Sequence, residues 1–137
     1  MSPSVHRDID LIRELMFRLE ALDKEPTSVA TLDPASEELA IPGFGPDQIE
    51  YHLRLIYEAG YVETGTRGDG QTLDGKFLFR RLTHRGHDFI DSVRDPEVWK
   101  RTKSAATKAG GWTLGLLKDL GTAFVKQVIK ERTGLDI

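Results

Sequence analysis

The densest group of chemically versatile side chains lies in LTHRGHDFIDSVRDP, residues 82–96, with two histidines, two arginines and three aspartates. Histidine and carboxylate side chains can hold a metal ion or transfer protons near neutral pH. His84 and His87 are three residues apart at the expected start of a helix, so they can share one face. A stable metal site needs further ligands and a supporting second shell, and only Asp88 and Asp91 lie close in sequence. The stretch also lacks the H-E-x-x-H spacing of helical zinc sites, so we expect no metal site.

Other residues that resemble catalytic motifs also favour structural roles. Asp8 and Asp10 lie two residues apart on an expected helix and point to different sides, which suits the helix dipole better than one metal ion. Gly68 and Gly70 lack the lysine of a phosphate-binding loop, and no Ser-His-Asp pattern is present. His52 flanks an apolar stripe and is expected to be hydrogen-bonded and partly buried. Without cysteine there is no thiol chemistry, and we expect a protein that is not an enzyme and needs no cofactor.

Charge is unevenly distributed along the 137 residues, whose formal net charge is −3. Residues 1–66 hold 5 Lys and Arg against 13 Asp and Glu, whereas residues 67–108 hold 10 against 6. A basic middle beside an acidic start suits either a surface for a polyanion or neutralisation within the fold. The length suits one domain with a real core. Because no apolar signal segment or membrane-spanning run is visible, we expect a cytoplasmic protein without membrane contact.

Apolar spacing predicts a mostly helical chain of the α+β class. Stripes with a period near 3.6 residues indicate helices, alternation indicates strands, and clusters of Gly, Pro, Asp and small polar residues indicate loops. Pro26 follows the first helical pattern and Pro96 starts a later one. We expect helices at residues 7–24, 46–60, 83–94, 96–109 and 112–134, strands at residues 61–65 and 76–82, and loops at residues 26–36 and 66–75.

IEYHLRLIYEAGYVE, residues 49–63, joins the second expected helix to the first strand. Ile49, Leu53 and Ile56 give this helix one buried stripe, and Gly60 can take the left-handed conformation that ends it. Two strands joined by a glycine-rich loop then form a β-hairpin wing. This order predicts a winged helix-turn-helix core at residues 1–95, followed by a helical extension at residues 96–137 that packs on the core or on a partner. The helix that usually precedes the recognition helix is absent or shortened into SEELAIPGFGP.

Several stretches together carry a family resemblance. RDIDLIREL, IEYHLRLIYEAGYVE, RLTHRGHDFIDSVRDPEVWKRTK and the tail that contains two adjacent glycines are similar to a bacterial and phage family catalogued as domain of unknown function 2513. The resemblance covers nearly the whole chain. It implies a bacterial or phage setting and a winged-helix core, and it assigns no activity, substrate or catalytic residue.

The winged-helix expectation makes double-stranded DNA the leading partner and a transcriptional regulator or accessory protein the leading function. In such a domain, a helix enters the major groove while basic residues on the wing contact phosphates. The outward face of residues 46–60 also presents Asp47, Glu50 and Glu58, which repel a polyanion. In the alternative, the basic residues of the wing pair with the acidic first helix. The candidate DNA-binding residues are Gln48, Tyr51, Arg54, Arg67, Lys76, Arg80, Arg81 and Arg85.

Protein binding is the second expected function. The last helix has apolar residues every four positions, which can cover the chain's own core, a second copy of the chain or a partner helix. In this alternative the chain is a phage or mobile-element factor that binds a host protein, or it forms a homodimer. The candidate interaction face is Trp112, Leu116, Leu120, Phe124 and Val128.

Overall fold

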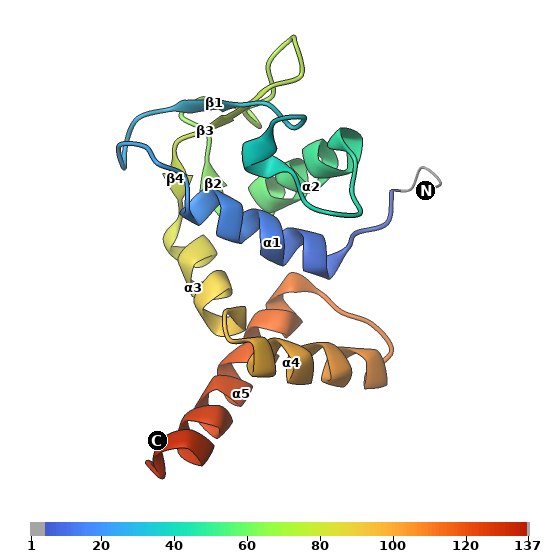
Figure 1. Ribbon diagram of the computed structural model, residues 1–137, viewed down its shortest axis with the longest axis vertical. Helices are drawn as coiled ribbons and strands as arrows, with labels where there is room; N and C mark the ends of the chain where they lie inside the picture. The colour runs from blue at the N-terminus through green and yellow to red at the C-terminus, as the bar shows by residue number, and fades with distance from the viewer. Residues whose placement is uncertain (1–4, 137) are drawn as a thin grey trace. The chain divides into compact units, whose positions relative to one another are not determined.

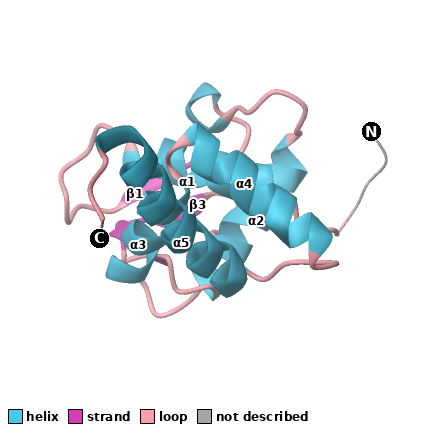
Figure 2. Cartoon of the chain, turned by 90° about the horizontal axis from the view of Figure 1, so that it is seen from below, coloured by secondary structure: helices cyan, strands magenta, loops and turns pink. Residues whose placement is uncertain are grey.

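The computed structural model describes residues 5–136, and within them the chain is a mostly helical α+β protein, as predicted (Figure 1). Helices dominate and the strands are short (Figure 2). Two compact units are present, one ending at His87 and one starting at Asp88, so the division falls within α3. The elements are α1 (Ile9–Glu20), β1 (Ala30–Leu32), the 3-10 turn η1 (Glu37–Leu39), α2 (Pro46–Glu58), β2 (Val62–Glu63), β3 (Phe77–Phe79), β4 (Arg81–Leu82), α3 (His84–Val93), α4 (Pro96–Lys108) and α5 (Leu114–Thr133).

In the first unit, α1 and α2 pack together through apolar stripes. The helix α1 begins at Ile9, later than predicted, because Asp8 caps it: the Asp8 side chain accepts the Leu11 N–H at 3.0 Å. It also ends at Glu20, four residues before the predicted end. The C-terminal end of α2 lies just before Gly60, whose φ of +79° confirms the predicted left-handed termination. The buried residues of the two helices are Leu11, Ile12, Leu15, Met16, Leu19, Ile49, His52, Leu53 and Ile56.

His52 ties the start of α1 to α2. Its ring is completely buried, Nε2 accepts the Asp8 N–H at 2.9 Å, and Nδ1 lies 2.8 Å from the Gln48 carbonyl oxygen. Because Nε2 accepts a hydrogen bond, Nδ1 must carry the proton and donate to Gln48. The predicted hydrogen-bonded histidine is confirmed, and it is more deeply buried than expected.

Four short strands follow an antiparallel pattern that the sequence predicted only in part. β1 pairs with β3, and β2 pairs with β4 (Figure 1). The predicted loop at residues 26–36 was wrong at Ala30–Leu32, because three residues are too few for a visible alternation and their partner lies far along the chain. The predicted strand at residues 76–82 is divided at Arg80, although the Arg80 N–H still donates to the Glu63 carbonyl oxygen at 2.8 Å.

The start of α3 packs closely on the backbone that precedes β2. The Thr83 hydroxyl accepts the Gly86 N–H at 3.1 Å and so caps this helix. A Cβ atom on Gly86 would lie 2.2 Å from the Tyr61 carbonyl oxygen. Only glycine therefore fits there without a shift of the backbone.

In the second unit, α4 and α5 pack against each other. Asp95 caps α4 by accepting the Glu97 N–H at 2.9 Å, and its other oxygen lies 2.7 Å from Arg132 at the end of α5. α5 starts at Leu114, not at Trp112, because the Thr113 hydroxyl caps it. The contact between Asp95 and Arg132 joins the beginning of α4 to the end of α5.

Candidate nucleic-acid interface

The outward face of α2 is occupied by the loop between β2 and β3. Arg54 lies 3.3 Å from the Asp69 carboxylate, and the Gln71 amide donates to Glu50 at 2.7 Å. Both loop residues come from the predicted wing. Arg54, the one cation on this face of α2, is therefore already paired, while Asp47 and Glu58 remain exposed beside it. A polyanion binds to unpaired cations, whereas this face presents exposed carboxylates and an arginine that is already paired.

Two other candidate cations also hold carboxylates within the first unit. Arg81 binds Glu63 through two hydrogen bonds of 2.6 and 3.1 Å, and Lys76 lies 3.3 Å from Asp33. The Ala35 N–H and the Lys76 ammonium lower the pKa of Asp33, so this carboxylate stays charged. Glu63, Asp33 and the partner of Arg54 all lie outside α1. The alternative in which wing cations pair with the first helix is therefore not what these ion pairs show.

Three arginines near the strands have no carboxylate partner within residues 5–136. Arg67 is exposed in the loop after β2, and Arg85 is exposed in the first turn of α3. Arg80 is exposed between β3 and β4, where its Nε donates to the Thr27 carbonyl oxygen at 3.1 Å. A carbonyl oxygen positions the guanidinium group but leaves its charge uncompensated. These three arginines are the strongest cationic groups of the candidate set that remain for an external anion.

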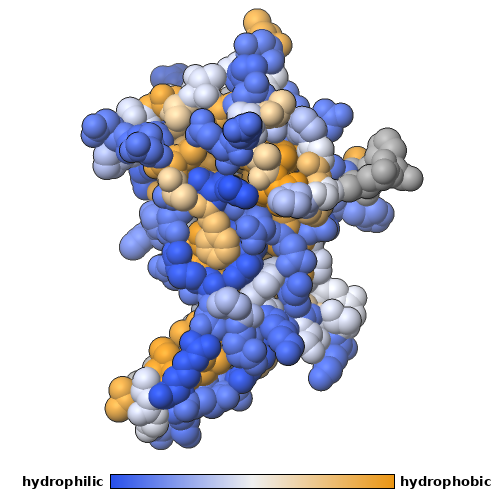
Figure 3. All heavy atoms as spheres, viewed as in Figure 1, coloured by the Kyte–Doolittle hydropathy of each residue, from blue (hydrophilic) through white to orange (hydrophobic). Residues whose placement is uncertain are grey.

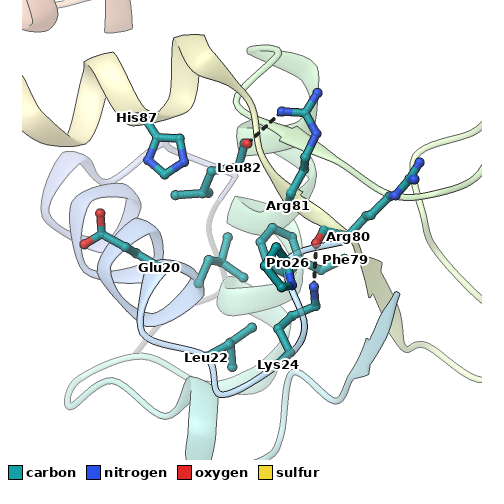
Figure 4. A pocket seen from close by; sticks show the side chains of 10 residues that line it. Glu20, Leu22, Lys24, Pro26, Phe79, Arg80, Arg81, Leu82 and His87 are labelled. Atoms are coloured by element: carbon teal, nitrogen blue, oxygen red, sulfur yellow. Dashed lines mark hydrogen bonds between the residues drawn. The ribbon is translucent and has the colours of Figure 1, made fainter. Parts of the chain in front are cut away.

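A hollow of about 260 Å³ lies beside Arg80 and Arg81 (Figure 4). Its lining combines apolar residues, such as Leu22 and Phe79, with an equal number of charged or titratable ones, and the side chains of the two arginines extend away from it. Lys24 donates from Nζ to the Arg80 carbonyl oxygen at 2.7 Å, which adds a cation to this edge of the strands. Lys24 was not among the predicted residues, because the sequence placed it at the end of the first helix, where nothing indicates that its side chain reaches the strands.

The remaining predicted site residues are placed as follows. Gln48 and Tyr51 are half-buried on α2. His84 and His87 are exposed at the start of α3, and no group of three or more metal-ligating side chains occurs in the part of the chain that the structure describes. No helix in residues 5–136 has the combined length and apolar character needed to cross a membrane.

The predicted interaction face of α5 is partly used by the fold. Val128 is buried, as are Leu117 and Gly121, whereas Trp112, Leu116, Leu120 and Phe124 are half-buried. Hydrophobic atoms are visible on the surface of this part of the chain (Figure 3). An interaction through these residues stays a prediction.

Comparison with models of protein families assigns the chain to one family. The profile of a family described as "Hypothetical protein (DUF2513)" matches residues 6–112. The chain belongs to the family domain of unknown function 2513. The resemblance inferred from sequence is thereby confirmed. The match to domain of unknown function 2513 includes α1 to α4 and ends before α5.

A sequence relative supplies no activity either. The chain is 27% identical over 125 residues to a protein of Haemophilus influenzae described as "Uncharacterized protein", with 90% of this chain and 98% of the relative covered. No solved structure matches the chain significantly. Membership of domain of unknown function 2513 therefore supplies no activity, and a function must be argued from the residues.

Proposed function

We propose that the first unit is a winged-helix module that binds double-stranded DNA through its wing and the adjoining start of α3. The order of elements supports this fold: a helix, a strand, a short turn, a second helix and then paired strands. β3 and β4 run consecutively along the chain and pair with β1 and β2, respectively. In this proposal η1 (Glu37–Leu39) stands where a fuller helix usually precedes the recognition helix.

The observation that carries the proposal is the group of exposed arginines at this edge of the strands. Arg67, Arg80 and Arg85 have no carboxylate partner among residues 5–136, so DNA phosphates can bind them without breaking an ion pair. Arg81 adds a guanidinium group whose Glu63 partner would have to share it. The proposal therefore assigns the contact with DNA to phosphates rather than to bases.

The charges on the exposed side of α2 argue against entry of this helix into the major groove. Base contacts would come from the exposed side of this helix, where Arg54 is bound to Asp69 and Glu50 is bound to Gln71. DNA phosphates would approach Asp47 and Glu58 at a cost in free energy. We therefore propose weak sequence specificity and an accessory or regulatory role on bacterial or phage DNA.

The test is the affinity for a fluorescent duplex, measured by anisotropy over a range of salt concentrations. Phosphate contacts release counterions, so the logarithm of the affinity should fall linearly with the logarithm of the salt concentration. The double substitution Arg80→Ala and Arg81→Ala should reduce that slope by about 2, because each lost phosphate contact removes roughly 0.9 from it.

The matched control is Lys118→Ala with Lys126→Ala on α5, which removes the same charge from the second unit. This control should keep the wild-type slope. Undetectable binding of duplex at low salt would sink the proposal, and an equal loss of slope in both double variants would show that only net charge matters.

A further inference from the structure

A second hollow, of about 410 Å³, lies between the end of α2 and the loop that follows β2. It is lined by Tyr57 of α2, by residues 62–67 and by Arg80. All of these residues belong to the first unit. The hollow brings together two arginines that are thirteen positions apart along the chain.

The charges around this hollow do not balance internally. Arg67 and Arg80 line it, and the one carboxylate in its lining is that of Glu63. Both oxygens of Glu63 are bound by Arg81, at 2.6 and 3.1 Å. Two guanidinium groups thus line one hollow without an anion of their own. The repulsion between two nearby positive charges is relieved when an anion binds between them.

The loop that carries Arg67 is held by its own hydrogen bonds. The Thr64 hydroxyl, which is buried, accepts the Thr66 N–H at 3.2 Å and lies 3.0 Å from the Gly68 carbonyl oxygen. The Thr66 hydroxyl accepts the Gly68 N–H at 3.2 Å. Arg67 lies between Thr66 and Gly68, so these hydrogen bonds restrain the loop on both sides of it, and such restraint lowers the entropy lost on binding.

Arg80 and Tyr57 complete the lining. The hydrogen bond from Arg80 Nε to the Thr27 carbonyl oxygen, at 3.1 Å, leaves the two terminal amino groups of the guanidinium for a ligand. The Tyr57 hydroxyl has no hydrogen-bond partner within residues 5–136 and can donate one. Two guanidinium groups and a phenol suit a tetrahedral oxyanion, which accepts several charge-assisted hydrogen bonds.

We propose that this hollow binds a phosphate group. The proposal deepens the proposed function and rests on it when the phosphate belongs to the DNA backbone. The same chemistry would also accept a free phosphate or a phosphate monoester. Tyr57 is then a new site residue, and Arg67 and Arg80 act as a pair that holds one phosphate.

The experiment follows the backbone amides of residues 64–67 and the Arg80 side-chain Nε–H by NMR in the full chain. One arm titrates inorganic phosphate against sodium chloride of equal ionic strength. The other arm titrates a blunt duplex with hydroxyl ends, which offers only phosphodiesters. We expect these signals to move in at least one arm, and the arm in which they move identifies the source of the phosphate.

Substitutions decide whether the hollow is responsible. Arg67→Ala should weaken the binding that moves these signals by about tenfold, as expected for a lost charge-assisted hydrogen bond. Tyr57→Phe should weaken it by about threefold. Lys126→Ala, which removes an exposed charge of α5 in the second unit, should change it by less than twofold.

The proposal is overturned if neither ligand moves these signals, or if Lys126→Ala weakens binding as much as Arg67→Ala. A duplex that binds with the salt dependence described above but leaves these signals unmoved would overturn the phosphate site and leave the proposed function standing. If the duplex does not bind but inorganic phosphate still moves the signals, the proposed function is overturned and the phosphate site stands.

Discussion

At the scale of single residues, His52 is the titratable group most closely built into the fold. It is completely buried, accepts one backbone hydrogen bond from Asp8 and donates another to Gln48. Burial lowers the pKa of His52 below its ordinary value of 6.5, and the Gln48 carbonyl and the Asp8 charge oppose this effect only in part. A proton on Nε2 would leave the Asp8 N–H facing a second donor.

His52 therefore makes stability depend on pH in a defined direction. As the pH falls below 6.5, the unfolded chain binds a proton at His52 while the folded chain does not, so the free energy of unfolding falls. The slope is at most about 1.4 kcal/mol per pH unit, and the contribution is complete above pH 6.5. His52→Gln should cost about 1–3 kcal/mol at pH 7.5 through lost hydrogen bonds.

Chemical denaturation of both proteins between pH 5 and pH 8 measures this difference. The gap in unfolding free energy between wild type and His52→Gln should shrink below pH 6.5, because the variant lacks the titrating group. A gap that stays constant or widens as the pH falls would show that His52 is not held neutral.

The residues of the candidate interface were predictable by type but not by partner. A run of basic residues after the second helix is visible in the sequence, and their approach to the strands follows from the order of elements. That Lys76 would meet Asp33, 43 positions away, is not visible, because β1 was taken for a loop. The sequence therefore overestimated how many cations remain for a ligand.

At the scale of elements, two glycines of α5 test how this helix packs. A Cβ atom on Gly121 would lie 2.3 Å from the Ser92 carbonyl oxygen, whereas the atom nearest to a Cβ on Gly115 would be 3.9 Å away. Gly121→Ala should destabilise the chain by about 1–3 kcal/mol, since backbone must shift to make room. Gly115→Ala should be neutral or stabilising by up to about 0.5 kcal/mol.

Thermal melts followed by circular dichroism compare the two variants directly. Both variants add one methyl group to the same helix, Gly115→Ala in its first turn and Gly121→Ala in its interior, and close packing opposes the methyl group only at Gly121. Equal melting temperatures for Gly115→Ala and Gly121→Ala would mean that α5 does not approach Ser92 as described.

Helices were easier to predict than strands for a physical reason. A helix of three turns repeats its apolar period several times, so α2 and α4 begin at the prolines that the sequence indicated. Strands of two or three residues contain at most one period, so β1 and the break at Arg80 depend on partners distant in sequence. The observed helix ends differ from the predicted ones by a few residues where a side chain such as that of Thr113 forms the cap.

At the scale of the whole molecule, the net charge of −3 says little about DNA binding. An acidic chain can bind a polyanion when its cations gather on one edge and its carboxylates lie elsewhere or are paired. The first unit has this separation: Arg67, Arg80 and Arg85 have no carboxylate partner among residues 5–136, while the side of α2 is acidic. The predicted division into residues 1–95 and 96–137 stays a prediction.

The most direct test of this account maps a duplex onto the full chain by backbone amide NMR at low salt. We predict shifts at residues 64–67 and 80–85 and little change at Asp47, Glu50 and Glu58 on α2. Residues of α4 and α5 serve as the internal reference. Shifts confined to the exposed side of α2, or no shift in the first unit at any duplex concentration, would contradict the claim that the wing and the start of α3 contact DNA.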